Sequence, residues 1–176
     1  MVGTTASIAP ARSDTGNSFF ELSSMITRRP VEPSDEAFLR SLHEAVQPVG
    51  LPAPLAQMQY RAEKAGYMAS YGECGHEIIE QDGEAIGRWW VHSTDLKIRL
   101  VDIRIAPKAQ RRGVGTELLR ELQGGATRPI LLSVAIDNQL ARQLYGRLGF
   151  VQIDQTGMHI HMEWRPVVME AVAGGR

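Results

Sequence analysis

Residues 103–119 read IRIAPKAQRRGVGTELL and join a strand pattern to a helix pattern through a basic, glycine-containing loop. Pro107 ends the apolar strand pattern, because proline has no N–H to give to a sheet ladder. Beyond the loop, Val114, Leu118 and Leu122 recur at every fourth residue, which is typical of an amphipathic helix. This strand–loop–helix unit is the most informative part of the sequence.

The loop has the features of an anion-binding site. Gly113 and Gly115 have no side chains, so a ligand can approach the main chain closely. The segment opens a helix, whose first N–H groups lack intrahelical partners and whose dipole favours negative charge. Arg111 and Arg112 add positive charge, so a pyrophosphate is the ligand that we expect this loop to bind. The nucleoside-triphosphatase loop is absent, and Leu118 stands where a dinucleotide-binding loop needs its third glycine.

The remaining patterns predict a single α/β (α+β) domain at residues 25–166, with a mixed, mostly antiparallel sheet flanked by helices. Residues 1–24 and 167–176 are expected to be tails. The expected order is β-α-α-β-β-β-α-β-α-β-β. Its segments are strand 25–28, helix 34–46, helix 55–65 closed by Gly66, strands 77–80, 85–91 and 97–105, a helix from 114 stopped by Gly124, strand 130–136, a helix from 139 to Gly149, and strands 150–153 and 158–164.

The strand at 97–105 has an irregular apolar pattern. Ile98 and Leu100 are apolar on one phase of the strand, whereas Val101, Ile103 and Ile105 are apolar on the other. One face of a regular strand cannot hold both sets. The pattern therefore leaves two interpretations open: a strand buried on both faces, or a bulge that resets the phase.

The overall composition restricts the classes of partner. Nineteen basic residues stand against twenty acidic ones, so we expect no nucleic-acid partner. No apolar run approaches the length of about 18 residues that a membrane span requires, so we expect no membrane partner. Cys74 is the single cysteine, which fits a reducing compartment. Because a secretory signal pattern is also missing, we expect a cytoplasmic location.

Two segments together resemble the GCN5-related N-acetyltransferase (GNAT) superfamily. Residues 103–119 are similar to that family's strand, Gln/Arg-x-x-Gly-x-Gly/Ala loop and helix for acetyl-CoA. Residues 138–150, NQLARQLYGRLGF, are similar to its Asn-x-x-Ala-x-x-x-Tyr-x-x-x-Gly-Phe segment, which follows the next strand. The likeness is sharp over residues 98–152, and upstream it is a likeness of element order.

The resemblance implies a role for each matching position. Main-chain N–H groups would hold the pyrophosphate of acetyl-CoA, and the main chain of the preceding strand would run beside the pantetheine and the acetyl carbonyl. Asn138 would bond the cofactor arm and also cap its helix. Tyr145 would be the general acid for the thiolate, the alternative being a packing tyrosine. The cofactor-binding residues implied are Ile103, Arg104, Ile105, Arg111, Arg112, Gly113, Val114, Gly115, Thr116 and Asn138.

The resemblance does not supply a general base. Other members carry a glutamate at one of two strand positions, which here are Arg99 and Ser133. Glu77, Asp102 and His92 are the remaining candidates, although an ion pair with Arg104 or Arg99 is the preferred interpretation of Asp102. His159 and His161 share a strand face, but no third ligand is apparent, so no metal site is expected.

The resemblance therefore implies an enzyme that moves an acetyl group from acetyl-CoA to a primary amine of a small-molecule or peptide acceptor. Two rival hypotheses stay open: a non-catalytic acyl-CoA-binding module, which the missing base motivates, and a nucleotide-binding domain. A homodimer is also left open. In this superfamily the early helices and the last hairpin build the acceptor site, here about residues 51–71 and 155–164. The aromatic residues that line it are expected among Tyr60, Tyr67, Tyr71, Trp89 and Trp90.

Overall fold

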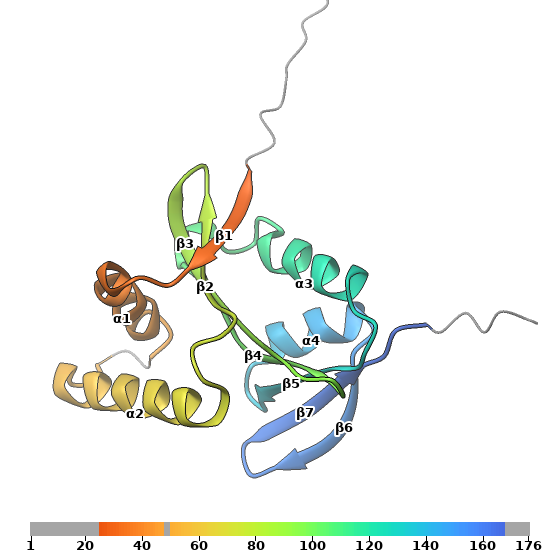
Figure 1. Ribbon diagram of the computed structural model, residues 1–176. Helices are drawn as coiled ribbons and strands as arrows, with labels where there is room; N and C mark the ends of the chain where they lie inside the picture. Colours follow the sequence, from red (N-terminus) through yellow and green to blue (C-terminus); the bar gives the residue numbers. More distant parts are fainter. Residues whose placement is uncertain (1–24, 48–49, 168–176) are drawn as a thin grey trace, which may run out of the picture.

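The computed structural model describes residues 25–47 and 50–167, so the expected tails lie outside the described residues, apart from Val167. A seven-stranded sheet forms the centre, with α-helices on both of its faces (Figure 1). None of the described helices is long and apolar enough to cross a membrane. The strands are β1 (Ile26–Pro30), β2 (His76–Gln81), β3 (Glu84–Ser93), β4 (Ile98–Ile105), β5 (Ile130–Ala135), β6 (Val151–Thr156) and β7 (His159–Trp164). The α-helices are α1 (Glu36–Glu44), α2 (Ala53–Tyr71), α3 (Val114–Gly124) and α4 (Gln139–Arg147), and two short 3-10 turns cover Pro33–Asp35 and Pro107–Ala109.

The sheet has the strand order β1-β2-β3-β4-β5-β7-β6. Every neighbouring pair is antiparallel except β4 and β5, which confirms the predicted mixed, mostly antiparallel sheet. The parallel pair is short, because it aligns only Ile98 with Ile130 and Arg99 with Leu131. Beyond these residues β4 and β5 have no paired positions, so the second half of β4 has no strand partner on that side.

The helices cover the sheet in two layers. Helices α3 and α4 lie on one face and α1 and α2 lie on the other (Figure 1). The larger apolar core lies under α3 and α4, where Leu119, Ile130 and Leu132 are at most 1% exposed. A smaller cluster of Leu39, Tyr60 and Ile78 lies under α1 and α2. The sheet is therefore buried on both faces near its middle.

The irregular pattern of β4 comes from a bulge. Asp102 pairs with Trp90 of β3 and Leu100 pairs with Val91, so Val101 is an extra residue on β4. The bulge shifts the phase of the strand, and Ile103 and Ile105 therefore pack against the same core that Ile98 and Leu100 enter. Of the two interpretations of the sequence, the bulge is confirmed.

Helix α2 is longer than predicted, and the prediction that Gly66 closes it is wrong. Gly66 lies inside the helix, and its place for a Cβ has no atom within 4 Å. A glycine within a helix costs only about 1 kcal/mol, which packing of the rest of the helix can offset. The helix ends instead at Gly72, whose φ of +69° is a conformation that favours glycine.

Candidate active site

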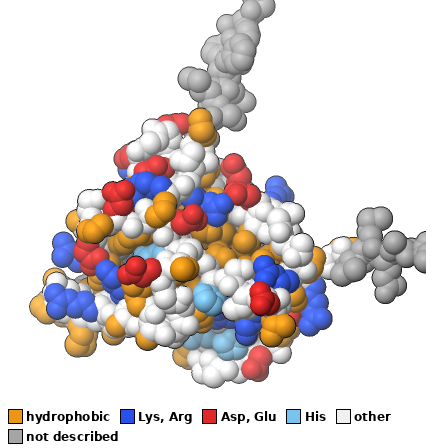
Figure 2. All heavy atoms as spheres, in the orientation of Figure 1, with side chains coloured by type: hydrophobic (Ala, Val, Ile, Leu, Met, Phe, Trp, Pro, Cys, Tyr) orange, Lys and Arg blue, Asp and Glu red, His pale blue; other side chains and the backbone are white. Residues whose placement is uncertain are grey.

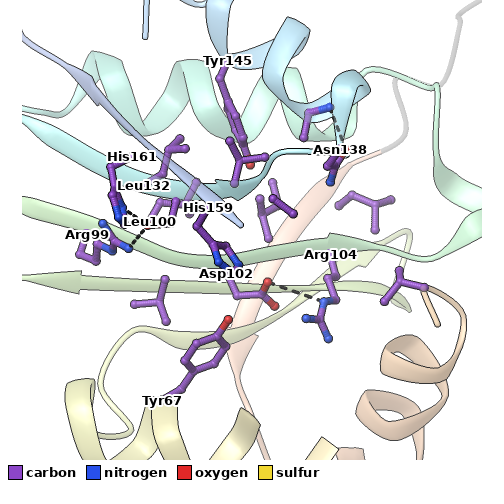
Figure 3. A pocket seen from close by; sticks show the side chains of 18 of the residues that line it. Tyr67, Arg99, Leu100, Asp102, Arg104, Leu132, Asn138, Tyr145, His159 and His161 are labelled. Carbon is purple, nitrogen blue, oxygen red and sulfur yellow. Dashed lines mark hydrogen bonds and ion pairs between the residues drawn. The ribbon is translucent and has the colours of Figure 1, made fainter. Parts of the chain in front are cut away.

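A pocket of about 640 Å³ lies where β4 and β5 diverge (Figure 3). Its wall is built from β4, β5 and β7, and α2 and α4 contribute side chains from opposite sides of the sheet. Tyr145 enters from α4 and Tyr67 from α2, while Asp102 lies between them on β4 (Figure 3). The pocket is thus lined from both faces of the sheet at the gap between β4 and β5.

The loop after β4 fits an anion. The Gln110 side chain donates from Nε2 to the carbonyl of Ile105 at 2.8 Å, which ties the loop to the end of β4. Gly113 is the N-cap of α3 with a φ of +85°, and its place for a Cβ is open space. The first helical bond runs from the Glu117 N–H to the Gly113 carbonyl at 2.9 Å. Consequently the N–H groups of residues 112–116 have no acceptor among the described residues and are free for a phosphate.

Tyr145 of α4 is a buried residue of the pocket wall. Its side chain is 7% exposed, and its ring packs against that of Phe150 with 5.7 Å between centroids. The hydroxyl points into the pocket between β4 and β5 (Figure 3). Burial raises the pKa of Tyr145, and the negative charge of Asp102 raises it further. The phenol is therefore protonated at neutral pH and has a proton to donate.

Asn138 caps α4, as the sequence predicted. Its Oδ1 accepts from the N–H of Ala141 at 3.1 Å, and the residue also lines the pocket. Because this oxygen serves the helix, its side-chain NH₂ is the part of Asn138 that remains for a ligand. The bond to a cofactor arm stays a prediction.

The candidate bases are not brought together. Glu77 pairs with Arg28 at 3.4 Å, and His92 lies beside Tyr71 with 5.6 Å between ring centroids. Neither lines the pocket. Asp102 does, but its Oδ2 accepts from Arg88 Nε at 2.6 Å and its Oδ1 lies 3.7 Å from Arg104 Nε. The expected ion pair with Arg104 is present, and the stronger contact is to Arg88.

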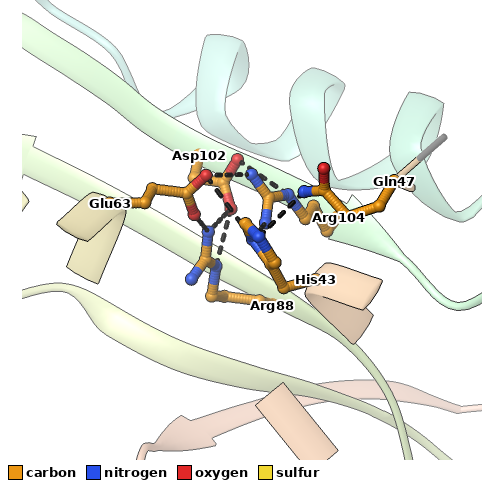
Figure 4. Close-up of polar contacts among 6 residues, drawn as sticks. All are labelled: His43, Gln47, Glu63, Arg88, Asp102 and Arg104. Atoms are coloured by element: carbon orange, nitrogen blue, oxygen red, sulfur yellow. Dashed lines mark hydrogen bonds and ion pairs between the residues drawn. The ribbon is translucent and has the colours of Figure 1, made fainter. Parts of the chain in front are cut away.

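The sequence did not reveal the buried cluster to which Asp102 belongs (Figure 4). Glu63 of α2 accepts from Arg88 at 3.0 Å and from Arg104 at 2.8 Å, and it lies 3.7 Å from His43 of α1. Burial alone would raise the pKa of Glu63, but the two arginines outweigh it and hold that pKa below its usual range. Burial lowers the pKa of His43, so its imidazole is neutral. Two carboxylates and two guanidinium groups balance within this cluster.

A second set of polar side chains, Arg99, Ser133 and His161, lies on the pocket wall near the residues where β4 and β5 still pair. Arg99 donates from Nη2 to Ser133 Oγ at 2.6 Å, and Ser133 Oγ lies 2.7 Å from His161 Nδ1. His159 lines the same pocket, so the two histidines share a face as predicted. Figure 2 shows histidine side chains at the surface over the β6–β7 hairpin. Within residues 25–47 and 50–167, no three His, Cys, Asp or Glu side chains converge as for a metal ion.

Two of the five candidate aromatic residues line the pocket. These are Tyr67 and Tyr71 of α2. Burial raises the pKa of Tyr67 to about 12, and the charges of Asp102 and Glu63 add to the effect. The other three candidates, Tyr60, Trp89 and Trp90, are core residues at most 2% exposed and do not line the pocket. Adjacent tryptophans on a strand point to opposite faces, and here helices cover both faces.

The family model described as "Acetyltransferase (GNAT) family" matches residues 38–150. It covers the β4 strand, the loop after it and the whole of α4. The chain therefore belongs to the GNAT family of acetyltransferases, and the observed fold is the fold of that family.

Particular relatives agree with this membership. Mycothiol acetyltransferase of Streptomyces coelicolor is 36% identical over 87 residues, which are 46% of this chain and 28% of that protein. The matched segment is therefore less than a third of that relative's length. Among solved structures, PH1933 from Pyrococcus horikoshii superposes with a TM-score of 0.65 at 16% identity, covering 80% of this chain and 98% of that one. The PaiA N-acetyltransferase from Thermoplasma acidophilum, in complex with coenzyme A, gives 0.63 at 18% identity over 80% and 99%. At these identities the likeness to the solved structures is one of fold.

Proposed function

We propose that this protein transfers an acetyl group from acetyl-CoA to a primary amine of a small-molecule or peptide acceptor by direct attack. The observation that carries the proposal is that two features lie at the same gap in the sheet, between β4 and β5: a loop suited to a phosphate and a buried tyrosine. A loop with free N–H groups follows β4, and a protonated tyrosine points into the space between β4 and β5. Membership of the GNAT family supports the same reaction.

The donor would bind along β4 and its loop. The main chain of Ile103, Arg104 and Ile105 has no strand partner on the β5 side, so it is available to the pantetheine arm. The loop offers N–H groups and two exposed arginines to the pyrophosphate, and Asn138 offers its NH₂ to the arm. The residues assigned to the loop contacts are Arg111, Arg112, Gly113, Val114, Gly115 and Thr116.

The proposed chemistry is an acyl transfer with a balanced proton count. The acceptor nitrogen attacks the carbonyl carbon, a C–N bond forms, the C–S bond breaks, and the electron pair leaves with the sulfur. Tyr145 donates its phenolic proton to that sulfur. The acceptor enters as an ammonium, so its nitrogen loses one proton before it attacks and a second one after the C–N bond forms, and the overall reaction releases one proton. His159 and His161 line the pocket wall, and an imidazole nitrogen can accept a proton from the acceptor. Positioning of the two reactants supplies much of the rate.

Two measurements test the proposal. Calorimetry with acetyl-CoA, ATP and NAD should give binding of acetyl-CoA alone, and absence of that binding would contradict the proposed donor. Thiol release should then be followed over small amines, polyamines, amino acids, aminoglycosides and peptides. Release of CoA with an acceptor supports an enzyme, whereas binding without any release would support the acyl-CoA-binding module.

Replacing Gly113 by alanine should raise the dissociation constant of acetyl-CoA about tenfold, which is the effect of losing one charge-assisted hydrogen bond. The φ of +85° at this residue disfavours any side chain and strains the loop by about 1–2 kcal/mol. Calorimetry of the folded variant measures the affinity. Gly124→Ala is the matched control, because Gly124 lies in the last turn of α3 with open space around its Cβ position. Equal affinity of the two variants would remove Gly113 from the binding loop.

A further inference from the structure

Arg99 lies on the pocket wall at the point where β4 separates from β5. It is the last residue of β4 that pairs with β5, and it comes two positions before the bulge at Val101. Its side chain reaches Ser133 of β5, which in turn contacts His161 of β7 (Figure 3). Their strand neighbours Leu100, Leu132 and Met162 enter the core that Tyr145 also enters, so these three side chains lie on the opposite face of the sheet, the face on which α2 lies. Arg99 therefore faces the acceptor side of the pocket.

The hydrogen-bonding capacity of Arg99 is mostly unused. Nη2 donates to Ser133 Oγ, whereas Nε is buried and has no partner among the described residues. A guanidinium has five N–H donors. No carboxylate of the described chain lies within 4.0 Å of Arg99, although Arg88 and Arg104 each have carboxylate partners. A half-buried guanidinium without a counter-charge indicates that an anionic ligand completes its surroundings.

The charge balance of the pocket points the same way. Asp102 and Glu63 are matched by Arg88 and Arg104 in the buried cluster. This matching leaves Arg99 as the surplus positive charge of the wall. A simple amine enters as a cation and would be repelled by it, and a polyamine would be repelled more strongly. An acceptor that carries its own negative group beside the amine removes this repulsion.

We infer that Arg99 binds a carboxylate of the acceptor and that the acceptor is an amino acid or a similar small amino-carboxylate. This inference rests on the proposed function and names its substrate class. A planar carboxylate accepts two parallel N–H bonds from one guanidinium, which makes arginine the residue best suited to this recognition. Ser133 fixes the guanidinium plane by its bond to Nη2. Arg99 is thus a specificity-determining residue on the acceptor side.

Matched acceptors test the inference. A panel of amino acids and their carboxamides, which differ only in the carboxylate, is assayed for thiol release with acetyl-CoA. The expected result is a preference of about 10- to 100-fold in kcat/KM for the carboxylate form. Arg99→Gln should abolish this preference with unchanged affinity for acetyl-CoA, and Arg99→Lys should restore part of it. Arg128→Gln is the control, because Arg128 also has a buried, unpartnered Nε but contacts only Thr94 and Ser93, away from the pocket.

Binding separates a failure of the inference from a failure of the proposed function. Each amino acid and its carboxamide is titrated by calorimetry into protein saturated with CoA, a measurement that does not need turnover. Carboxylate-selective binding that Arg99→Gln removes supports the inference, even if no acceptor releases CoA. Equal binding or turnover of both forms, or a preference that survives in Arg99→Gln, overturns it. Release of CoA by carboxamides alone would overturn the inference while supporting the acetyl transfer.

Discussion

Replacing Tyr145 by phenylalanine should lower kcat by about 10²- to 10⁴-fold, the usual contribution of a positioned general acid. The hydroxyl points into the gap where the thiolate would depart, and burial keeps it protonated. Phenylalanine preserves the ring and its contact with Phe150, so folding and the affinity for acetyl-CoA should be nearly unchanged. Steady-state thiol release gives kcat, and calorimetry gives the affinity.

Tyr60→Phe is the matched control for the loss of a tyrosine hydroxyl. Tyr60 is 2% exposed and lies in the smaller core, and its hydroxyl is buried beside the carboxylate of Glu36, outside the pocket. Its removal should leave kcat unchanged. If Tyr145→Phe is as active as Tyr60→Phe, then Tyr145 is a packing residue, which was the alternative interpretation of the sequence.

The elements around the loop between β4 and α3 were predictable, because their signals are local. Pro107, the Gly113 and Gly115 pair and the fourfold spacing from Val114 define a strand, a loop and a helix without reference to distant residues. The order of strands and helices along the chain follows from similar signals. The phase slip within β4 also indicated a bulge, although sequence alone could not separate it from a strand buried on both faces.

Features that depend on distant contacts were not predictable. Gly66 looks like a helix end, but α2 continues to Tyr71, and Tyr67 in these later turns packs edge-on against Trp90. Trp89 and Trp90 look like pocket residues, but each strand face at that point is covered. The sequence predicts a partner for Asp102 on its own strand, and Arg104 is such a partner, but the closer contact comes from Arg88 of β3. No local sequence pattern indicated the role of Glu63 on α2, because its partners lie on two strands and on helix α1.

Replacing Arg88 by methionine should lower the free energy of unfolding by about 3–5 kcal/mol, since removing one partner leaves buried charge uncompensated. Arg88 is 2% exposed and contacts both Asp102 and Glu63, which would then share Arg104 alone. Urea denaturation measures the change. Lys64→Ala is the control: its pair with Glu36 at 2.6 Å is partly solvated, with side chains 38% and 50% exposed, and is worth less than about 1 kcal/mol. Equal changes in the two variants would contradict the role of the cluster.

The same contacts make stability depend on pH in a defined direction. Arg104 and Arg88 lower the pKa of Glu63 in the folded state, so the unfolded chain binds a proton more readily. The stabilisation is therefore complete above the ordinary glutamate pKa and is lost as pH falls through the lowered one. Arg88→Met should weaken this acid sensitivity, because it removes one of the two charges that cause it.

The cluster also links stability to the part of the pocket that α2 lines. Glu63 lies one helical turn before Tyr67 on α2, and its bonds to Arg88 and Arg104 hold that turn against β3 and β4. The loop between β4 and α3 makes no contact with Arg88 among the polar contacts of the described residues. Under conditions where Arg88→Met is folded, the KM of the acceptor should therefore rise more than the dissociation constant of acetyl-CoA. An equal loss of both affinities would mean that the cluster supports the sheet as a whole and not the position of α2.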